Sequence, residues 1–535
     1  MTLRLARAAA AVTVAAALSG SSHLAGQPAR ESPRDRLERA YRASNRGVAL
    51  LEQFDYVPAA EAFREALRID PSLSTAHLNL AIALLYAGQS SAALPEARPA
   101  ATALPDAPQP AYVLGLIARA ENRTDEAIAE FRKVLQIDPV DAGANVNLGQ
   151  LLLQSRQYAD AVAPFRAAVA AEPYNATAAY GLAMSLTRSG DAAAGQQQMA
   201  RFQTLRDSPY AVTYGQGYLE QGRYAEAFAS TGAEPGLVDR STPAVRFVPD
   251  AAAMPARGSG GRRAILADVD GDGDLDLVVA GDSGAHLLRN EGGRFTPTNA
   301  IPAVAAGTTE ITVTAGDFDN DRRPDLFVAG RSSARLLHQK ADGSFEDVSA
   351  AAGLPRDLHA GAAAWVDVDH DGDLDLVTAA PVRLLRNNGN GSFTDVTSAA
   401  GLSVSPGDET APAAVVPTDY DNRRDIDLLI LSGGAPLHLF RNMRDGTFKD
   451  VARDAGLPGA TGISAVAAAD VNKDGFIDVF LGRVDAPGVF ALSDGRERFH
   501  LVDAPAATSD ASLALFLDYD NDGLLDLLVA TPRGP

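Results

Sequence analysis

Residues 268–276 read DVDGDGDLD, which places carboxylates at positions one, three, five and nine of a short loop. Alternate residues of a turning loop can all point inward, and glycine permits the sharp turn that this requires. Calcium takes six to eight oxygen ligands at about 2.3–2.6 Å, whereas magnesium fits a flexible all-protein cage less well. The run therefore predicts a loop that wraps a calcium ion.

Similar acidic loops recur along the second half of the chain. The six loops begin at Asp268, Asp317, Asp367, Asp419, Asp470 and Asp518, with 48 to 52 residues between successive starts. Such regular recurrence predicts one structural unit copied six times. The predicted calcium ligands, one set per intact loop, are Asp268, Asp270, Asp272, Asp276, Asp317, Asp319, Asp321, Asp325, Asp367, Asp369, Asp371, Asp375, Asp470, Asn472, Asp474, Asp478, Asp518, Asp520, Asp522 and Asp526.

Two loops depart from the pattern of the first. In the second loop Arg322 stands where glycine is expected, so the turn there is less certain. In the fourth loop Arg423 occupies the fifth position, between Asp421 and Asp427, and this loop is left out of the predicted ligand set. Aspartate and glycine also favour solvated turns without metal, and this alternative is preferred only for the fourth loop.

The loops are not EF-hands, although an EF-hand begins in the same way. An EF-hand needs a bidentate acid at position twelve and a helix on each side. Position twelve holds Val, Thr, Ile or Leu in all six loops. Apolar runs typical of strands flank the first loop, at residues 264–267 and 277–280. We therefore predict strand–loop–strand sites.

The rest of each repeat completes a four-stranded unit. Leu-Arg-Asn or Phe-Arg-Asn recurs at residues 288–290, 385–387 and 440–442, and a glycine turn and a phenylalanine follow. About fifty residues per four-stranded unit is typical of a β-propeller blade. On these motifs residues 244–535 resemble the FG-GAP or VCBS repeat family, the integrin-α-type propellers. The resemblance implies that each acidic loop joins the first two strands of a blade and holds calcium.

The sequence ends at Pro535, directly after the second predicted strand of the sixth repeat. Residues 245–248 look like a displaced fourth strand that would close the ring against the last blade. We therefore expect a propeller that is C-terminally truncated.

The first half of the chain repeats with a period of 34 residues. Small residues keep this spacing at Gly47, Ala81, Gly115, Gly149 and Ala183, and prolines keep it at Pro71, Pro105, Pro139 and Pro173. A small residue on one helix lets a second helix approach closely, an aromatic residue fills the gap, and proline ends the pair. Each unit is therefore predicted to be a helical hairpin.

On these positions residues 40 to about 207 resemble the tetratricopeptide repeat family, with a sixth, partial unit suggested between Tyr214 and Ala227. Prolines fall inside two predicted second helices, which we expect to be kinked or short: Pro95 and Pro99 in the second unit, and Pro164 in the fourth. The resemblance implies a concave groove, lined by first helices, that holds a protein or peptide partner. Candidate residues on that face are Asn79, Tyr112, Asn145 and Tyr180.

Composition and the first residues indicate the setting. The net charge of −21 disfavours nucleic acid and anionic membranes as partners, and the absence of cysteine excludes disulfides and thiolate metal sites. Arg4 and Arg7 precede an apolar run at residues 8–18 that is too short to cross a bilayer, which is typical of a signal peptide. We expect export to the periplasm or the extracellular space, without a transmembrane span.

The predicted organisation is a multidomain chain in which an N-terminal α-solenoid precedes an all-β propeller. Its parts are a signal peptide at 1–27, tetratricopeptide repeats at 37–232, a linker at 233–261 and six FG-GAP/VCBS repeats at 262–535. The pairing of the two repeat types is similar to bacterial exported proteins that end in an ASPIC/UnbV domain, and that domain is absent from this sequence.

Catalytic motifs are missing from the sequence. It contains no His-Glu-x-x-His pair, no phosphate-binding glycine loop with lysine and no Gly-x-Ser-x-Gly elbow. We therefore expect no enzymatic activity, and predict a calcium-binding scaffold or adhesion protein. The alternative is a calcium-dependent saccharide-binding protein or a polysaccharide lyase, which would need a Lys, Arg or Tyr base beside a calcium ion, with a glycan on the propeller.

Overall fold

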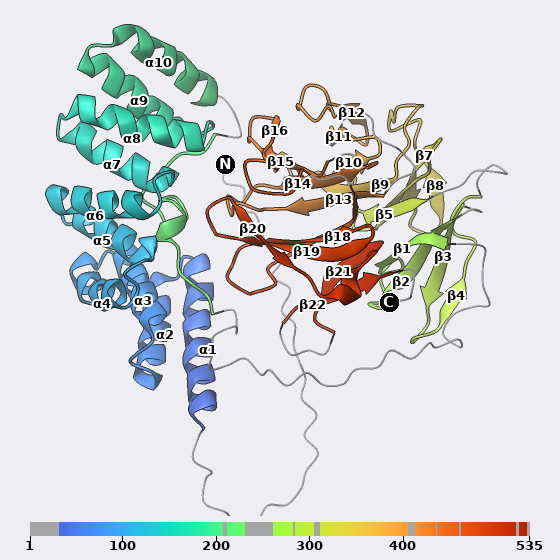
Figure 1. Ribbon diagram of the computed structural model, residues 1–535, viewed down its shortest axis with the longest axis horizontal. Coiled ribbons are helices and arrows are strands. Elements are labelled where there is room, and N and C mark those ends of the chain that lie inside the picture. The colour runs from blue at the N-terminus through green and yellow to red at the C-terminus, as the bar shows by residue number, and fades with distance from the viewer. Residues whose placement is uncertain are drawn as a thin grey trace, which may run out of the picture.

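The computed structural model describes residues 32–206, 211–230, 261–281, 284–303, 311–404, 412–434, 436–459, 462–519 and 524–531. They form an array of helices followed by a ring-like series of antiparallel sheets (Figure 1). The predicted signal peptide, almost all of the predicted linker and the predicted strand at 245–248 lie outside the described residues. In the described part of the chain, no helix has the length and apolar character needed to cross a membrane.

Ten α-helices lie in the described part of the N-terminal domain. They are α1 (Pro33–Glu52), α2 (Tyr56–Ile69), α3 (Ser74–Tyr86), α4 (Ser90–Ala103), α5 (Pro108–Ala120), α6 (Thr124–Ile137), α7 (Ala142–Gln154), α8 (Tyr158–Ala171), α9 (Ala176–Ser189) and α10 (Ala192–Arg206). Consecutive helices pack against each other as five hairpins. The first helix begins at Pro33, a few residues before the predicted start of the array at residue 37.

Close contact between a glycine and an aromatic ring fixes the distance between the two helices of a hairpin. A Cβ atom on Gly47 would lie 2.6 Å from the Phe63 ring, and one on Gly149 would lie 2.8 Å from the Phe165 ring. Phe63 and Phe165 are both fully buried. The predicted packing of small residues against aromatic residues is confirmed.

The prolines do not shorten the second helices. Pro95 and Pro99 lie inside α4 and Pro164 lies inside α8, yet both helices have 14 residues, as α2 and α6 do. Proline removes one main-chain donor, but packing against the neighbouring helices keeps the helix continuous. The expectation of short helices at these positions was wrong.

Residues 211–230 do not form the sixth helical unit that the sequence suggested. They contain a single turn of 3-10 helix, Arg223–Ala225, and otherwise extended or turn conformations. This segment runs along the array and contributes the buried residues Tyr218 and Tyr224 to its core. Its glycines and tyrosines match the repeat pattern by residue type, whereas its helical propensity and length are insufficient for a hairpin.

In the described residues from 261 to 531, twenty-two strands form the second domain. The first two blades contain β1 (Gly261–Ala267), β2 (Asp276–Gly281), β3 (Gly284–Asn290), β4 (Phe295–Pro297), β5 (Thr312–Gly316), β6 (Asp325–Ala329), β7 (Ala334–Gln339) and β8 (Phe345–Asp347). The next two contain β9 (Ala362–Val366), β10 (Asp375–Ala379), β11 (Arg383–Asn387), β12 (Phe393–Asp395), β13 (Ala413–Thr418), β14 (Asp427–Ser432), β15 (His438–Asn442) and β16 (Phe448–Asp450). The last contain β17 (Ile463–Ala469), β18 (Asp478–Arg483), β19 (Ala486–Ser493), β20 (Phe499–Asp503), β21 (Leu513–Leu517) and β22 (Asp526–Ala530), with a 3-10 turn at Ala506–Thr508.

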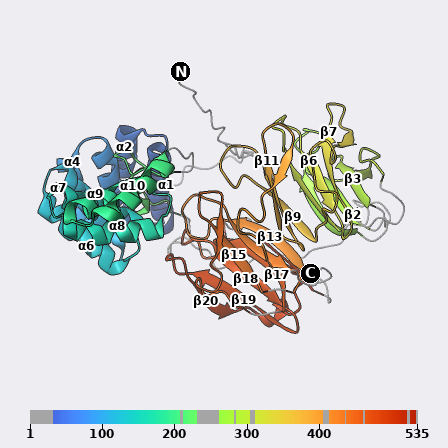
Figure 2. The same ribbon diagram turned by 90° about the horizontal axis from the view of Figure 1, so that it is seen from above.

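The sheets have the order of propeller blades. Five are four-stranded antiparallel meanders in chain order, and β21 with β22 forms a two-stranded sheet. The first strands of successive blades, β1, β5, β9, β13, β17 and β21, pack side by side, which gives the arrangement of sheets seen in Figure 2. Each apolar core lies between two consecutive blades, as with Val278 and Leu326 between the first two. The predicted β-propeller fold is confirmed.

Candidate functional site

The acidic loops lie where the sequence placed them. In every blade the loop begins directly after the first strand, and its ninth residue is the first residue of the second strand. In the third blade, for example, Val366 ends β9, Asp375 opens β10, and the two residues pair across the ladder. These are strand–loop–strand sites, as predicted.

The first aspartate of each loop holds the turn together. In the first loop the carboxylate of Asp268 accepts the amide of Gly271 at 2.8 Å and that of Gly273 at 3.1 Å. In the second loop Asp317 accepts the amide of Arg322 at 2.7 Å, and Arg322 adopts φ 71°. Arg322 therefore takes the left-handed conformation that glycine takes in the first, third and fifth loops, and Arg424 does the same in the fourth loop, so the turn is kept despite the substitution.

The ninth residue of each loop ties the loop to the sheet. Asp375 is fully buried, and its two carboxylate oxygens accept the amides of Val368 at 3.1 Å and Asn387 at 2.7 Å. The corresponding pair of bonds is made by Asp276, Asp325, Asp427 and Asp478. These main-chain donors fix the carboxylates in position while leaving lone pairs for a cation.

Carboxylates converge within the loops as a cation would require. Sets of oxygens that lie within 4.8 Å of one another come from Asp268, Asp270 and Asp276 in the first loop, Asp317, Asp319 and Asp321 in the second, Asp367, Asp369 and Asp371 in the third, and Asp419, Asp421, Asp425 and Asp427 in the fourth. In the second loop His338 also approaches Asp319 and Asp325. In the third loop Asp369 Oδ1 is buried without a hydrogen-bond partner.

Burial and crowding perturb these carboxyl groups. Burial raises the pKa of Asp375 to about 7, although hydrogen bonds from two main-chain amides oppose the rise. Burial, followed by repulsion from Asp371, raises the pKa of Asp369. The charged forms are thus disfavoured in the metal-free protein, and a bound cation would reverse this by supplying the missing positive charge.

The remaining two loops are described to different extents. In the fifth loop Asp470, Asn472, Asp474 and Asp478 lie in the predicted order, with Asp470 accepting the amide of Gly475 at 2.9 Å. In the sixth loop Asp520 and Asp522 lie outside the described residues, whereas Asp526 accepts the amide of Tyr519 at 3.2 Å. In the described part of the sixth loop, the ninth aspartate therefore makes the same bond to the loop as in the other blades.

Family models match both halves of the chain. The FG-GAP-like repeat model matches residues 268–328, 317–378 and 419–481, and the tetratricopeptide repeat model matches residues 78–142 and 146–201. The chain is a tetratricopeptide and FG-GAP repeat protein. The matched FG-GAP segments each begin at the first aspartate of a loop described above.

The sequences of two curated proteins are similar to a short part of this chain. Cartilage acidic protein 1 from Homo sapiens is 33% identical over 108 residues, which are 19% of this chain and 16% of that protein. Its counterpart from Mus musculus is 32% identical over 108 residues, 19% of this chain and 17% of that protein. The chain thus spans about a sixth of the length of these relatives.

Solved structures with some similarity to this one cover about a third of the chain. The crystal structure of the MamA protein has a TM-score of 0.30 and 15% identity, and covers 32% of this chain and 93% of its own. YrrB, a tetratricopeptide repeat protein with an unusual peptide-binding site, has a TM-score of 0.28 and 17% identity, and covers 32% of this chain and 87% of its own.

FG-GAP loops of neighbouring blades are joined by side chains that the sequence did not single out as functional. The side-chain amide of Asn387, at the end of β11, donates to the Phe318 carbonyl in the second loop at 2.7 Å. Asn442 and Gln339 make the same link, to Val368 and Val269 respectively. The recurring Leu-Arg-Asn motif was the visible signal, because its asparagine occupies this position in two blades.

The inner face of the tetratricopeptide array is covered by the chain's own residues 211–230. The Asn79 side chain donates to the Phe228 carbonyl at 2.7 Å and accepts the Phe228 amide at 2.9 Å. One unit earlier, Asn45 makes the same pair of bonds with Ser230, at 2.7 and 2.6 Å. The segment reaches α9 at its other end, where the Tyr214 amide donates to Thr177.

Three of the four predicted groove residues therefore do not present an open binding face, and only Tyr180 among them is exposed. Asn79 binds Phe228, and the Tyr112 hydroxyl donates to the Gln221 carbonyl. Asn145 is 3% exposed and donates to Pro139 and Asp141 within its own turn. Tyr180 is 44% exposed and packs on Phe202 with ring centres 5.1 Å apart. The expectation that these residues line one free groove is corrected: an internal segment occupies it.

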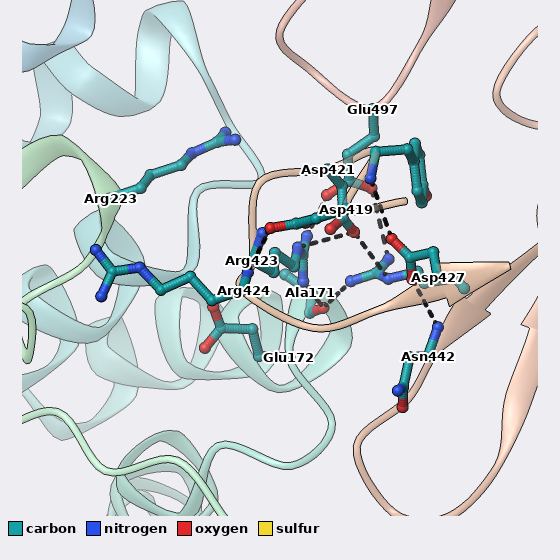
Figure 3. A network of polar contacts seen from close by, with 12 residues as sticks. Ala171, Glu172, Arg223, Asp419, Asp421, Arg423, Arg424, Asp427, Asn442 and Glu497 are labelled. Carbon is teal, nitrogen blue, oxygen red and sulfur yellow. Dashed lines mark hydrogen bonds and ion pairs between the residues drawn. The ribbon is translucent and has the colours of Figure 1, made fainter. Parts of the chain in front are cut away.

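The fourth FG-GAP loop touches the helical domain (Figure 3). Arg423 and Arg441 both donate to the carbonyl of Ala171, the last residue of α8, at 2.6 and 3.0 Å. Arg424 donates to Glu226 at 2.6 Å, and the Arg444 guanidinium lies 5.5 Å from the centre of the Tyr174 ring. A cavity of about 260 Å³ lies at this junction. This contact between the domains was not predicted from the sequence.

Proposed function

We propose that the protein is an exported calcium-binding scaffold that holds protein partners and catalyses no reaction. The observation that carries the calcium assignment is the convergence of carboxylate oxygens at the same point of successive blades. The buried Asp369 Oδ1 without a hydrogen-bond partner supports it, because such an oxygen is costly unless a cation or water contacts it. An all-oxygen donor set suits calcium.

The residues of this chain explain how an ion would act on the fold. Carboxylates at positions one, three, five and nine would bind it, while positions one and nine also hold the loop turn and the second strand. Asn387 then links one loop to the next blade. Binding to the native arrangement alone stabilises that arrangement, so calcium would make successive blades melt together.

Repeat architecture supports a protein as the partner. Helical repeats and propellers offer large rigid surfaces, and both are present here. Because residues 211–230 cover the inner face of the array, we place the partner on the remaining surface. Phe54, Val57 and Tyr180 are exposed there at 54%, 54% and 44%.

Calcium binding is tested by counting ions in the full chain. Equilibrium dialysis against calcium should give several ions per chain, and Asp369→Ala should remove one of them. Asp373→Ala, at position seven of the same loop, is the matched control, because Asp373 lies outside the carboxylate set of that loop. No calcium bound by the wild-type chain at millimolar concentration would exclude the proposal.

The competing proposal is a calcium-dependent saccharide-binding protein or lyase. Arrays of glycans and pull-downs from the native source distinguish the two classes. A glycan bound in calcium and lost in EDTA, without a protein partner, would favour the saccharide class. Depolymerisation of a polysaccharide by the purified chain would contradict the absence of catalysis.

A further inference from the structure

The fourth loop differs from the other loops at position seven. Asp425 is 2% exposed, whereas Asp274, at the same position of the first loop, is exposed, and Asp373 in the third loop is partly exposed. Neither carboxylate oxygen of Asp425 has a hydrogen-bond partner in the described structure. Asp425 lies with Asp419, Asp421 and Asp427 in one set of oxygens within 4.8 Å. A buried carboxylate in this position needs a positive partner or a proton to offset its desolvation.

Arginine at position five does not fill that role. The terminal nitrogens of Arg423 point away from the set, toward the Ala171 carbonyl and the Glu497 carboxylate. Its Nε lies 3.2 Å from Asp421 Oδ2, and its main-chain amide donates to Asp419 Oδ1 at 2.9 Å. Arg441 Nε lies at the same distance from Asp421 Oδ2 as Arg423 Nε does. Both arginines therefore form ion pairs with Asp421, but no hydrogen bond reaches either carboxylate oxygen of Asp421 or of Asp425 in the described structure.

We propose that the fourth loop is a divalent-cation site in which Asp425 supplies the ligand that Arg423 does not, and that the cation held there fixes the helical domain against the propeller. The site rests on the proposed calcium binding of the other loops, but its ligand set is different. The sequence pattern does not predict this site, because position five of the fourth loop holds an arginine and not a ligand.

Asp421 connects the site to the contact between the domains. Asp421 contributes one oxygen to the carboxylate set, and its Oδ2 lies 3.2 Å from the Nε atoms of the two arginines that bind Ala171. The Ala171 carbonyl ends α8, where the helix dipole is negative and attracts guanidinium groups. Without a cation the four carboxylates repel one another, which would move Asp421 and loosen both arginines. A cation would hold Asp421 and hence the contact.

Counting ions on matched variants tests the site. Asp425→Asn should bind one calcium ion fewer than the wild-type chain, whereas Asp274→Asn, the same position in the first loop, should bind the wild-type number. Asp425→Asn should also melt at a higher temperature than the wild type in EDTA, because it removes a buried unpaired charge, and this shows that the variant folds. An unchanged ion count for Asp425→Asn would overturn the proposal.

Terbium provides a second measurement on an unaltered ligand set. Tyr420 lies at position two of this loop and is 3% exposed, so its excitation should sensitise terbium bound there. Tyr420→Phe should remove part of the tyrosine-sensitised emission without changing the calcium count. We expect Asp425→Asn to lose the same part of the tyrosine-sensitised terbium emission. Emission from Tyr420 that survives Asp425→Asn would contradict the assignment.

The connection to the helical domain is measured by energy transfer. The chain has no cysteine, so dyes can be placed on Gln154→Cys in α7 and Lys340→Cys in the second blade. Calcium should narrow the distribution of transfer efficiencies in the wild type and in Asp274→Asn, but not in Asp425→Asn. Equal narrowing in all three would refute the connection. If no loop binds calcium, the proposed function fails as well, whereas an unaffected count in Asp425→Asn alone refutes only this inference.

Discussion

Replacing Asn79 by alanine should selectively destabilise the helical domain. Asn79 is fully buried on α3, and its side chain holds both the amide and the carbonyl of Phe228. Alanine would remove two hydrogen bonds, each worth about 1 kcal/mol, and leave main-chain groups without a protein partner. We expect the free energy of unfolding of the helical domain to fall by about 2–3 kcal/mol.

The two domains can be followed separately in one urea titration. Helix content at 222 nm reports the array, and the fluorescence of the single tryptophan, Trp365 on β9, reports the propeller. With an m-value of about 2 kcal/mol/M, the helical transition should shift by about 1 M urea. The tryptophan transition should move much less, because Asn79 contacts no blade.

Asn45→Ala is the internal comparison for this variant. Asn45 makes the same two bonds to Ser230 but is only partly buried, so water can replace part of what is lost. We expect a loss of about 1 kcal/mol. If Asn79→Ala shifted the helical transition no further than Asn45→Ala, residues 211–230 would not be an integral part of the array.

Three further variants or conditions test other parts of the account. Gly149→Ala should cost about 1–3 kcal/mol, because the new Cβ would lie 2.8 Å from the Phe165 ring; an unchanged helical melt would refute this close packing. In EDTA the propeller should melt at a higher temperature at pH 5 than at pH 8, because burial raises the pKa of Asp375 to about 7 in the folded state. The folded state then holds the Asp375 proton more tightly than the unfolded state, and the resulting stabilisation is full below about pH 4 and is lost as the pH rises through 7. A melting temperature that rises with pH would contradict this. Asn387→Ala should lower the propeller melting temperature by several degrees through the lost link to the preceding blade, whereas Asn388→Ala, whose bonds are local and exposed, should not.

The regular parts of the fold could be read from the sequence because each repeat carries its own local pattern. Spacing of 34 residues among small residues predicted the hairpins, since helix packing requires close approach once per unit. The acidic loops predicted the strands on both sides of the first loop to within a few residues, and the observed second strand opens at the ninth aspartate because that side chain bonds to the sheet. Arg322 shows that even a loop without the expected glycine keeps this geometry.

Contacts between distant parts of the chain could not be read in this way. The segment at 211–230 binds the array mostly through main-chain groups, which leave no pattern in the sequence. From the sequence, Arg423 only marked the loss of a calcium ligand, because its hydrogen-bond partner, the Ala171 carbonyl, belongs to another domain. The burial of Asp425 was equally hidden, since Asp274 and Asp373 occupy the same loop position without being buried.

The central claim is that the aspartate loops are cation sites that hold the blades together. The direct test is the thermal melt of the full chain followed by Trp365 fluorescence, in 10 mM calcium and after exhaustive dialysis against EDTA. With dissociation constants of about 10⁻⁴–10⁻³ M, four or more filled sites should raise the propeller transition by about 10 °C or more. The helical signal should shift much less. A propeller transition at the same temperature in both conditions would contradict the claim.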